Sequence, residues 1–415
     1  MRDRLTWIQL HTSDRMYRGL ALIPWTQKHH FRTGGHMSIS CRFAVLLWLL
    51  SSILRCAHAA DTPPIVVTIG FAAPLTEVSA RQGRNAALLA IEEINRGNPS
   101  INGRAVVFEL LEQDDKADPR ISEFIARSFT NSKAIGVVGH WNSATTVAAA
   151  PIYHAAGLAQ ISPFSWSRSF TQKSYKTAFQ IIGSDDAGLA LAADYLVGEQ
   201  KLRRVLVLDD GGFLGTSMAD YFSNHAKAAD GEIIQRMSIS GNTSDFNQPL
   251  QKAREAQADL IFFSGRVMQS DVLARNLQRF RLPAKLLLTG SVVSPSFLKN
   301  AGDIDSTILA IVPSTPLDKR PGMTALQKKY ADRFGGEMIP FAVYSYDSVQ
   351  LLAAAAKKAN SLDRGKIIEA LHEIRHNGVS ASIAFDANGA LLKPGYTLYS
   401  YQNKGWTPLR VFNGK

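Results

Sequence analysis

Cysteine is scarce in this chain of 415 residues, which contains only two. Both of them, Cys41 and Cys56, precede residue 61 and so lie ahead of the regular pattern described below. The rest of the chain therefore has no disulfide, no thiol nucleophile and no cysteine metal ligand. A chain of this length can form cores large enough to be stable without disulfides, and its length favours two lobes.

Long hydrophobic runs are also missing. The apolar run 43–54 has about twelve residues and falls short of the roughly 20 that a membrane-spanning helix needs. It follows Met37 and Arg42 and precedes the small residues Ala57 and Ala59, which is the layout of a cleavable export signal. We therefore expect an exported protein, although an uncleaved anchor is an alternative. On this interpretation residues 1–36 are an upstream extension, and the signal peptide spans 37–60 and starts at Met37.

Acidic residues are outnumbered, with 35 Asp and Glu against 46 Lys and Arg, for a net charge of +11. Residues 1–60 hold eight of the basic residues and two of the acidic ones, so the remaining chain carries 38 against 33, or +5. This modest excess gives little support for a nucleic-acid partner, and we expect none.

Motifs of catalysis are few. There is no G-x-S-x-G and no G-x-x-x-x-G-K-[ST]. His372 and His376 are four residues apart in HEIRH (372–376) and could share a helix face, but Asn377-Gly378 follows directly, so we favour a solvated helix end over a metal site. The glycine-rich stretch DDGGFLGTS (209–217) departs from the dinucleotide fingerprint, and its two acids would repel a pyrophosphate. The acids in QDDKADPR (113–120) suggest a metal cluster, but Asp118 before Pro119 also fits a helix N-terminus, which we favour. We expect no enzyme, no cofactor and no metal.

Apolar strands and helices alternate along the rest of the chain. This alternation predicts α/β lobes with parallel, doubly wound sheets. In the first set we predict strands at 65–73, 105–115, 134–139 and 158–162, and helices at 84–95, 120–132 and 143–156. In the second set we predict strands at 204–210, 232–239, 259–265 and 284–290, and helices at 186–199, 215–228, 246–256 and 269–280. Helices at 323–334, 341–359 and 364–374 follow, and then a hairpin at 396–412 that turns at Asn403-Lys404-Gly405.

One segment combines a strand end, hydroxyl side chains and a helix start. It is VVGHWNSATTVAAAPIYHAAGLAQISP (137–163), in which Ser143, Thr145 and Thr146 crowd the predicted helix N-terminus. Such hydroxyls can cap the helix or help to hold a carboxylate, because a helix N-terminus carries free N–H groups and partial positive charge. In open α/β sheets ligands bind beyond the carboxyl ends of strands. On the residues alone, both roles stay open.

This segment, together with IGFAAPLT, EQDDKADPR, VLVLDDGGFLGTSMA and PFAVYSYDSVQLLAAAAKKA, resembles the periplasmic Leu/Ile/Val-binding family. These are type I solute-binding proteins of ABC transporters, and the resemblance covers nearly all of 65–412. It implies two Rossmann-like lobes joined by three crossovers, near 181–185, 312–316 and 385–393. The lobes would comprise 61–182 with 315–384, and 184–312 with 386–415.

The resemblance also implies a ligand site. It places Ser143 on a ligand carboxylate, and it matches Phe164, Ser165 and Trp166 to a second contact loop, with Trp166 where the family has threonine. It implies that Phe213 is the aromatic residue that covers the ligand. At a second position where the family has an aromatic residue, this chain has Arg266. The family's acid for an α-ammonium falls near Gly290, where no acid stands; Asp185 or Asp186 is a possible substitute. An aliphatic amino acid and another small carboxylate, such as an aromatic one, both stay open.

The function implied is that of a monomeric periplasmic protein that delivers an amino acid or other small carboxylate to an inner-membrane ABC permease. A sensor of the same fold is the first alternative. A nucleotide-dependent α/β enzyme is the second, although the phosphate fingerprint it would need is missing.

Overall fold

The computed structural model divides the chain into Met1–Thr62 and a compact unit, Pro63–Lys415. It describes residues 63–413 except 291, 295–296 and 298–306. The predicted extension and signal peptide lie outside the described residues. No helix in the described part is long and apolar enough to cross a membrane.

The first sheet is built from residues 100–180 together with strand β1. Its strands are parallel except for the antiparallel pair β2–β3. From residue 67 onward every residue of β1 is buried, because helices cover both faces of the sheet. The strand order is β2 (Ser100–Ile101), β3 (Arg104–Asp114), β1 (Ile65–Ala73), β4 (Gly136–Gly139), β5 (Ala159–Ser162) and β6 (Ala178–Gln180).

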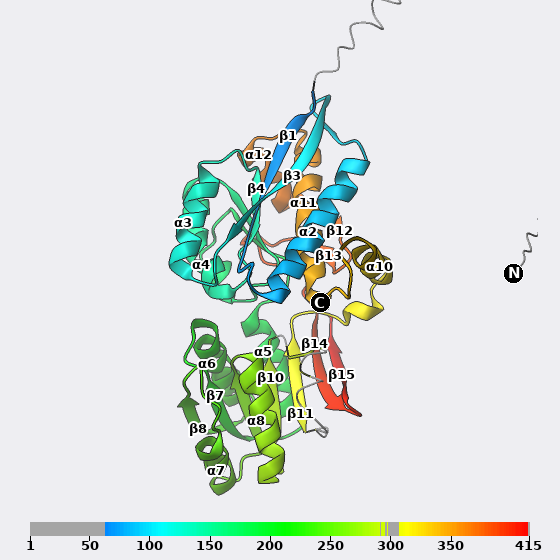
Figure 1. Cartoon of the computed structure of the whole chain (residues 1–415). Coiled ribbons are helices and arrows are strands. Elements are labelled where there is room, and N and C mark those ends of the chain that lie inside the picture. Colours follow the sequence, from blue (N-terminus) through cyan, green and yellow to red (C-terminus); the bar gives the residue numbers. More distant parts are fainter. Residues whose placement is uncertain (1–62, 291, 295–296, 298–306, 414–415) are drawn as a thin grey trace, which may run out of the picture. The chain divides into compact units, whose positions relative to one another are not determined.

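Helices from two distant parts of the chain cover this sheet (Figure 1). One face carries α3 (Pro119–Thr130) and α4 (Ser143–Ala155), and the other carries α2 (Val78–Arg96), α11 (Val343–Ala359) and α12 (Arg364–Glu373). The predicted cap of α3 is confirmed, since Asp118 Oδ1 accepts the Arg120 N–H at 2.7 Å. Among the described residues no group of acidic, His or Cys side chains could hold a metal ion.

The second sheet combines the middle of the chain with its last strands. The five strands from β7 to β11 are parallel, and the C-terminal hairpin adds antiparallel β14 and β15. Its order is β15 (Gly405–Phe412), β14 (Tyr396–Gln402), β11 (Ile308–Val312), β10 (Lys285–Thr289), β9 (Leu260–Ser264), β7 (Arg204–Asp209) and β8 (Glu232–Ser238). Its helices are α5 (Asp185–Ala193), α6 (Phe213–Ala228), α7 (Asn247–Glu255) and α8 (Val267–Phe280).

The chain passes between the two sheets three times. It leaves the first sheet after β6 and returns after β11 to form α10 (Met323–Phe334) and the helices already described. It then passes the short ladder of β12 (His376–Asn377) and β13 (Ser382–Ile383) to reach β14. These connections fall at or beside the three predicted joints. The predicted α/β class is confirmed, while the lobe boundaries stay a prediction.

The third connection packs tightly on the edge of the first sheet. Gly389 accepts the Gln180 N–H through its carbonyl at 2.8 Å and has a φ of +80°. A Cβ at this position would lie 1.8 Å from the Ala178 carbonyl oxygen. Glycine is therefore required here by conformation and by space.

Candidate functional site

Ser143 begins α4 directly beyond the carboxyl end of β4. Its side chain is 6% exposed, and its Oγ accepts a hydrogen bond from the Ser165 hydroxyl at 3.1 Å. Thr145 and Thr146 have other partners, because they donate to the carbonyls of Asn142 (2.8 Å) and His140 (2.9 Å). Of the three hydroxyls at this helix start, Ser143 is the one joined to the neighbouring loop.

The loop after β5 supplies that neighbour. Ser165 is buried, and its carbonyl accepts a hydrogen bond from the Gln180 side chain at 2.8 Å. Phe164 stacks on Trp141 with ring centroids 4.8 Å apart and meets the edge of Phe341 at 5.3 Å. The structure thus brings Ser143 and Ser165 into contact beside an aromatic cluster.

Two cavities meet at Trp166, which is 5% exposed. The smaller one, which we call the aromatic cavity, has a volume of about 30 Å³. It is lined by Phe164, Trp166, Ile182, Gly290, Pro313, Phe341 and Tyr344. The larger one, the polar cavity, has a volume of about 140 Å³. It is lined by Trp166, Asp210, Leu214, Gly215, Met218, Ser264, Gly265, Arg266, Thr289 and Gly290.

The polar cavity therefore joins Trp166, which follows β5 of the first sheet, to residues at the carboxyl ends of β7, β9 and β10 of the second. It contains groups of both charges. Asp210 follows β7 and accepts the Gly212 N–H through Oδ1 at 3.0 Å. Arg266 directly precedes α8. Burial and the Asp115 carboxylate raise the pKa of Glu77, and the positive charge of Arg266 partly offsets this increase. This position also places Arg266 within electrostatic reach of the loop after β1.

Phe213 is placed differently from the expectation. It is the first residue of α6 and is 46% exposed, whereas the next residue, Leu214, lines the polar cavity. A ligand contact by Phe213 stays a prediction. Sequence reasoning missed Asp210 and Leu214, although both belong to the glycine-rich stretch 209–217 that joins β7 to α6.

Asp185 lies apart from both cavities. It is fully buried at the start of α5, where Oδ1 accepts the N–H groups of Arg168 (2.9 Å) and Asp186 (2.8 Å). Its Oδ2 has no hydrogen-bond partner among the described residues. Burial raises the pKa of this carboxyl to about 6.

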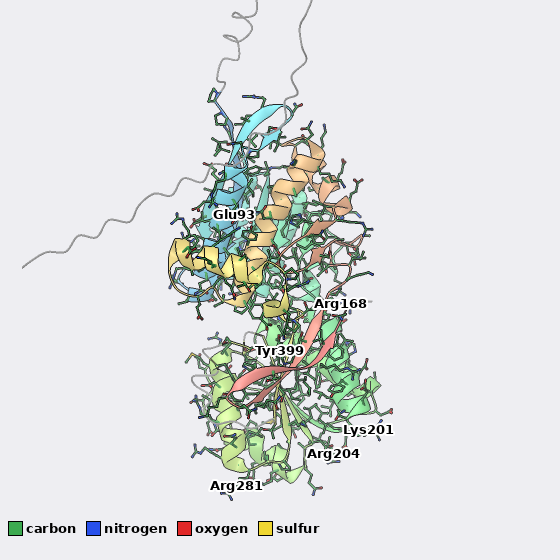
Figure 2. All side chains as sticks on the ribbon, turned by 90° about the vertical axis from the view of Figure 1, so that its right-hand side faces the viewer. Glu93, Arg168, Lys201, Arg204, Arg281 and Tyr399 are labelled. Carbon is green, nitrogen blue, oxygen red and sulfur yellow. The ribbon has the colours of Figure 1, made fainter. Side chains whose placement is uncertain are left out.

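The neighbouring Asp186 binds partners from two other elements. Its Oδ1 is 2.8 Å from His225 Nε2 of α6, and its Oδ2 pairs with Arg168, which is labelled in Figure 2. The two acids therefore anchor the first connection between the sheets, and a ligand contact by Asp185 stays a prediction.

Polar groups at strand ends beside an aromatic cavity define the class of molecule as an α/β ligand-binding protein. The sequence profile of the periplasmic binding protein family matches residues 66–405. The chain belongs to this family, whose fold and members are those of solute-binding proteins.

Individual relatives agree with this assignment. An amino acid binding protein of Pseudomonas aeruginosa is 29% identical over 346 residues, which cover 82% of this chain and 91% of the relative. The isoleucine complex of the branched-chain amino acid binding protein LivJ from Streptococcus pneumoniae has a TM-score of 0.71 at 23% identity, covering 84% and 99% of the two chains. A solute-binding protein from R. palustris in complex with benzoate has a TM-score of 0.72 at 16% identity, covering 84% and 97%. The last two likenesses show the shared type I fold.

Proposed function

We propose that this chain captures a small carboxylate, with an amino acid as the first candidate, and delivers it to an inner-membrane ABC permease. The observation that carries the proposal is the polar cavity, where Trp166 from one sheet meets Asp210 and Arg266 from the other. Capture would occur by hinge closure between two lobes, 61–182 with 315–384 and 184–312 with 386–415. The protein would act in the periplasm as a monomer after removal of its signal peptide.

The ligand carboxylate would bind near the contact between Ser143 and Ser165. In that place a hydroxyl, the main chain around Phe164 and the N-terminus of α4 supply donors and partial positive charge. The two serine side chains are buried and hydrogen-bonded to each other. We infer that a bound carboxylate breaks this hydrogen bond and accepts hydrogen bonds from the two hydroxyls instead. The name of the Pseudomonas relative supports an amino acid.

An α-ammonium needs a counter-charge, because burying it alone is costly. The family position near Gly290 offers none, but Asp210 on the wall of the same cavity supplies a carboxylate. We therefore propose Asp210 as the ammonium partner, with Leu214 as an apolar contact for the side chain.

An aromatic carboxylate without an ammonium is the second candidate. Trp166 and the aromatic cavity would contact its ring, and Arg266 would pair with its charge. The benzoate complex shows that this fold accommodates such a ligand in another protein.

Calorimetric titration with amino acids and with aliphatic and aromatic carboxylates tests the proposal. For an amino acid, Asp210→Asn should weaken binding by about 1.5–3 kcal/mol, the usual contribution of a hydrogen bond to a charged group. The exposed Asp230→Asn is a matched control that should leave affinity unchanged. For an aromatic carboxylate, Arg266→Gln should weaken binding more than Asp210→Asn does. A protein that bound no member of the panel would contradict the proposal.

A further inference from the structure

A third cavity, which we call the hinge pocket, lies at the three connections between the sheets. Its volume is about 220 Å³. It is lined by residues from all three connecting segments, within 181–182, 313–315 and 391–395, and by Arg320, Tyr344, Ser380, Ala381, Ser382 and Asn413. This volume is large compared with the roughly 30 Å³ share of one water molecule in the liquid.

The polar groups of the hinge pocket suit an anion. Arg320 and Lys393 supply two positive charges, and Ser314, Thr315 and Ser382 supply hydroxyls. None of the residues that line it is acidic. Arginine offers a planar fork of donors, and lysine a compact charge, which together suit the oxygens of a small oxyanion.

Arg320 is the least satisfied of these groups. Its Nε is buried without a hydrogen-bond partner, and the side chain forms no ion pair with any residue that the structure describes. Buried donors without a partner are rare in folded proteins, and a missing ligand is one physical reason for them. The charge of Arg320 does reach the Tyr344 phenol, whose pKa burial raises well above its ordinary value, so that the phenol stays a donor.

Asp347, whose charge acts on the Tyr344 phenol in the wall of the hinge pocket, is already engaged. Asp347 accepts hydrogen bonds from the N–H groups of Val379 (3.0 Å) and Ser380 (2.7 Å). It also accepts the hydroxyl of Ser380, which lines the hinge pocket. The positive charges of Arg320 and Lys393 are therefore left without a carboxylate partner from the described chain.

We propose that the hinge pocket binds a free inorganic oxyanion, of the sulfate or phosphate type, between Arg320 and Lys393. Arg320 would donate through Nε and its terminal nitrogens, Lys393 would pair with the charge, and the hydroxyls of Ser314 and Thr315 would donate to the remaining oxygens. The anion would tie the second connecting segment to the third.

The position also couples this anion to the candidate ligand site. Ile182, Pro313 and Tyr344 line both the hinge pocket and the aromatic cavity. An anion that holds the connecting segments in one arrangement shifts the affinity of the ligand, and by linkage the ligand shifts the affinity of the anion equally. This coupling rests on the proposed function, whereas anion binding does not.

Calorimetric titration of the purified protein with inorganic phosphate and with sulfate tests the site, in a zwitterionic buffer of low ionic strength. We expect one saturable site. Arg320→Gln and Lys393→Gln should each weaken it at least about tenfold, because each removes a charge-assisted interaction. Lys319→Gln is the matched control, since Lys319 precedes Arg320, is exposed and does not line the hinge pocket. Its affinity should stay within about twofold of the original.

The absence of saturable binding would overturn the proposal, and so would an equal loss in Lys319→Gln, which would indicate general charge attraction. Should Arg320→Gln fail to fold by circular dichroism, Arg320→Lys and Lys393→Gln replace it, and unchanged affinity in both would overturn the site. Saturating phosphate should then alter the affinity for the carboxylate ligand. Phosphate binding without such an effect would refute the coupling and leave the anion site supported.

Discussion

Replacement of Asp185 by asparagine removes a buried negative charge and keeps the shape of the side chain. Oδ1 of asparagine can accept the same N–H groups of Arg168 and Asp186 that the carboxylate accepts. The second oxygen, which has no hydrogen-bond partner among the described residues, becomes an amide group. The change therefore tests the cost of the charge itself.

The magnitude follows from the pKa of the carboxyl, which burial raises from the ordinary 3.8 to about 6. At 1.36 kcal/mol per pKa unit the difference corresponds to about 3 kcal/mol. Below pH 4 the carboxyl is protonated in the folded and the unfolded chain, and folding incurs no penalty. As the pH rises from about 4 to 6 the unfolded chain loses its proton first, so the folded protein is destabilised by this amount above pH 6.

Urea denaturation at pH 3.5, 5 and 7.5 measures the effect. The free energy of unfolding of Asp185→Asn minus that of the original protein should rise by about 3 kcal/mol across this range. The amide adds a cost that does not vary with pH, since its N–H2 group is buried without an acceptor, so the net gain at pH 7.5 should be about 1–2 kcal/mol.

The half-buried Asp186 of the same turn provides the control. Asp186→Asn breaks contacts with Arg168 and His225 and should give no gain at pH 7.5. The reasoning about Asp185 fails if the difference between Asp185→Asn and the original protein is the same at pH 3.5 and pH 7.5.

Two further substitutions test the ligand site and the fold. Ser143→Ala should weaken carboxylate binding by about 1–2 kcal/mol in calorimetric titration, because one hydrogen bond to a charge is lost. Thr145→Val, which removes only a bond to a backbone carbonyl, should leave affinity unchanged; equal effects would remove Ser143 from the site. Gly389→Ala should lower the free energy of unfolding by about 2–4 kcal/mol, the sum of left-handed strain and a close approach to Ala178. Gly157→Ala, at the end of α4, also has a positive φ (+60°) but no neighbour within 4 Å, so urea denaturation should show only about 1–2 kcal/mol, and equal losses would contradict the steric account.

The sequence pattern predicted the fold well where apolar runs were bounded by turns. The strand 65–73 agrees with β1, and the hairpin turn is confirmed, since Asn403 and Lys404 both have positive φ. Helix starts were less accurate: α2 begins at Val78 and not at residue 84, because its first turn is polar and half exposed. Five strands were not predicted, namely β2, β6, β11, β12 and β13; all of these except β11 have only two or three residues, too few to show a period.

The candidate site was harder to predict than the fold. The contact between Ser143 and Ser165 follows from parallel strands whose ends share one edge, so sequence order sufficed to bring these residues together. The order of elements in the sequence did not predict which residues line the polar cavity. Whether Phe213 or Leu214 faces inward depends on the angle at which α6 leaves its turn, and a one-residue step on a helix rotates the side chain by about 100°.

The interleaving of the two sheets has a consequence for how the protein folds. A chain that has emerged only as far as β6 has all six strands of the first sheet but lacks α11 and α12, so α2 alone covers one face of that sheet. The second sheet likewise waits for β14, without which β11 is an open edge. Contacts this distant in sequence delay folding until nearly the whole chain is available, so a chain cut before residue 396 leaves both an exposed edge and a lasting risk of aggregation.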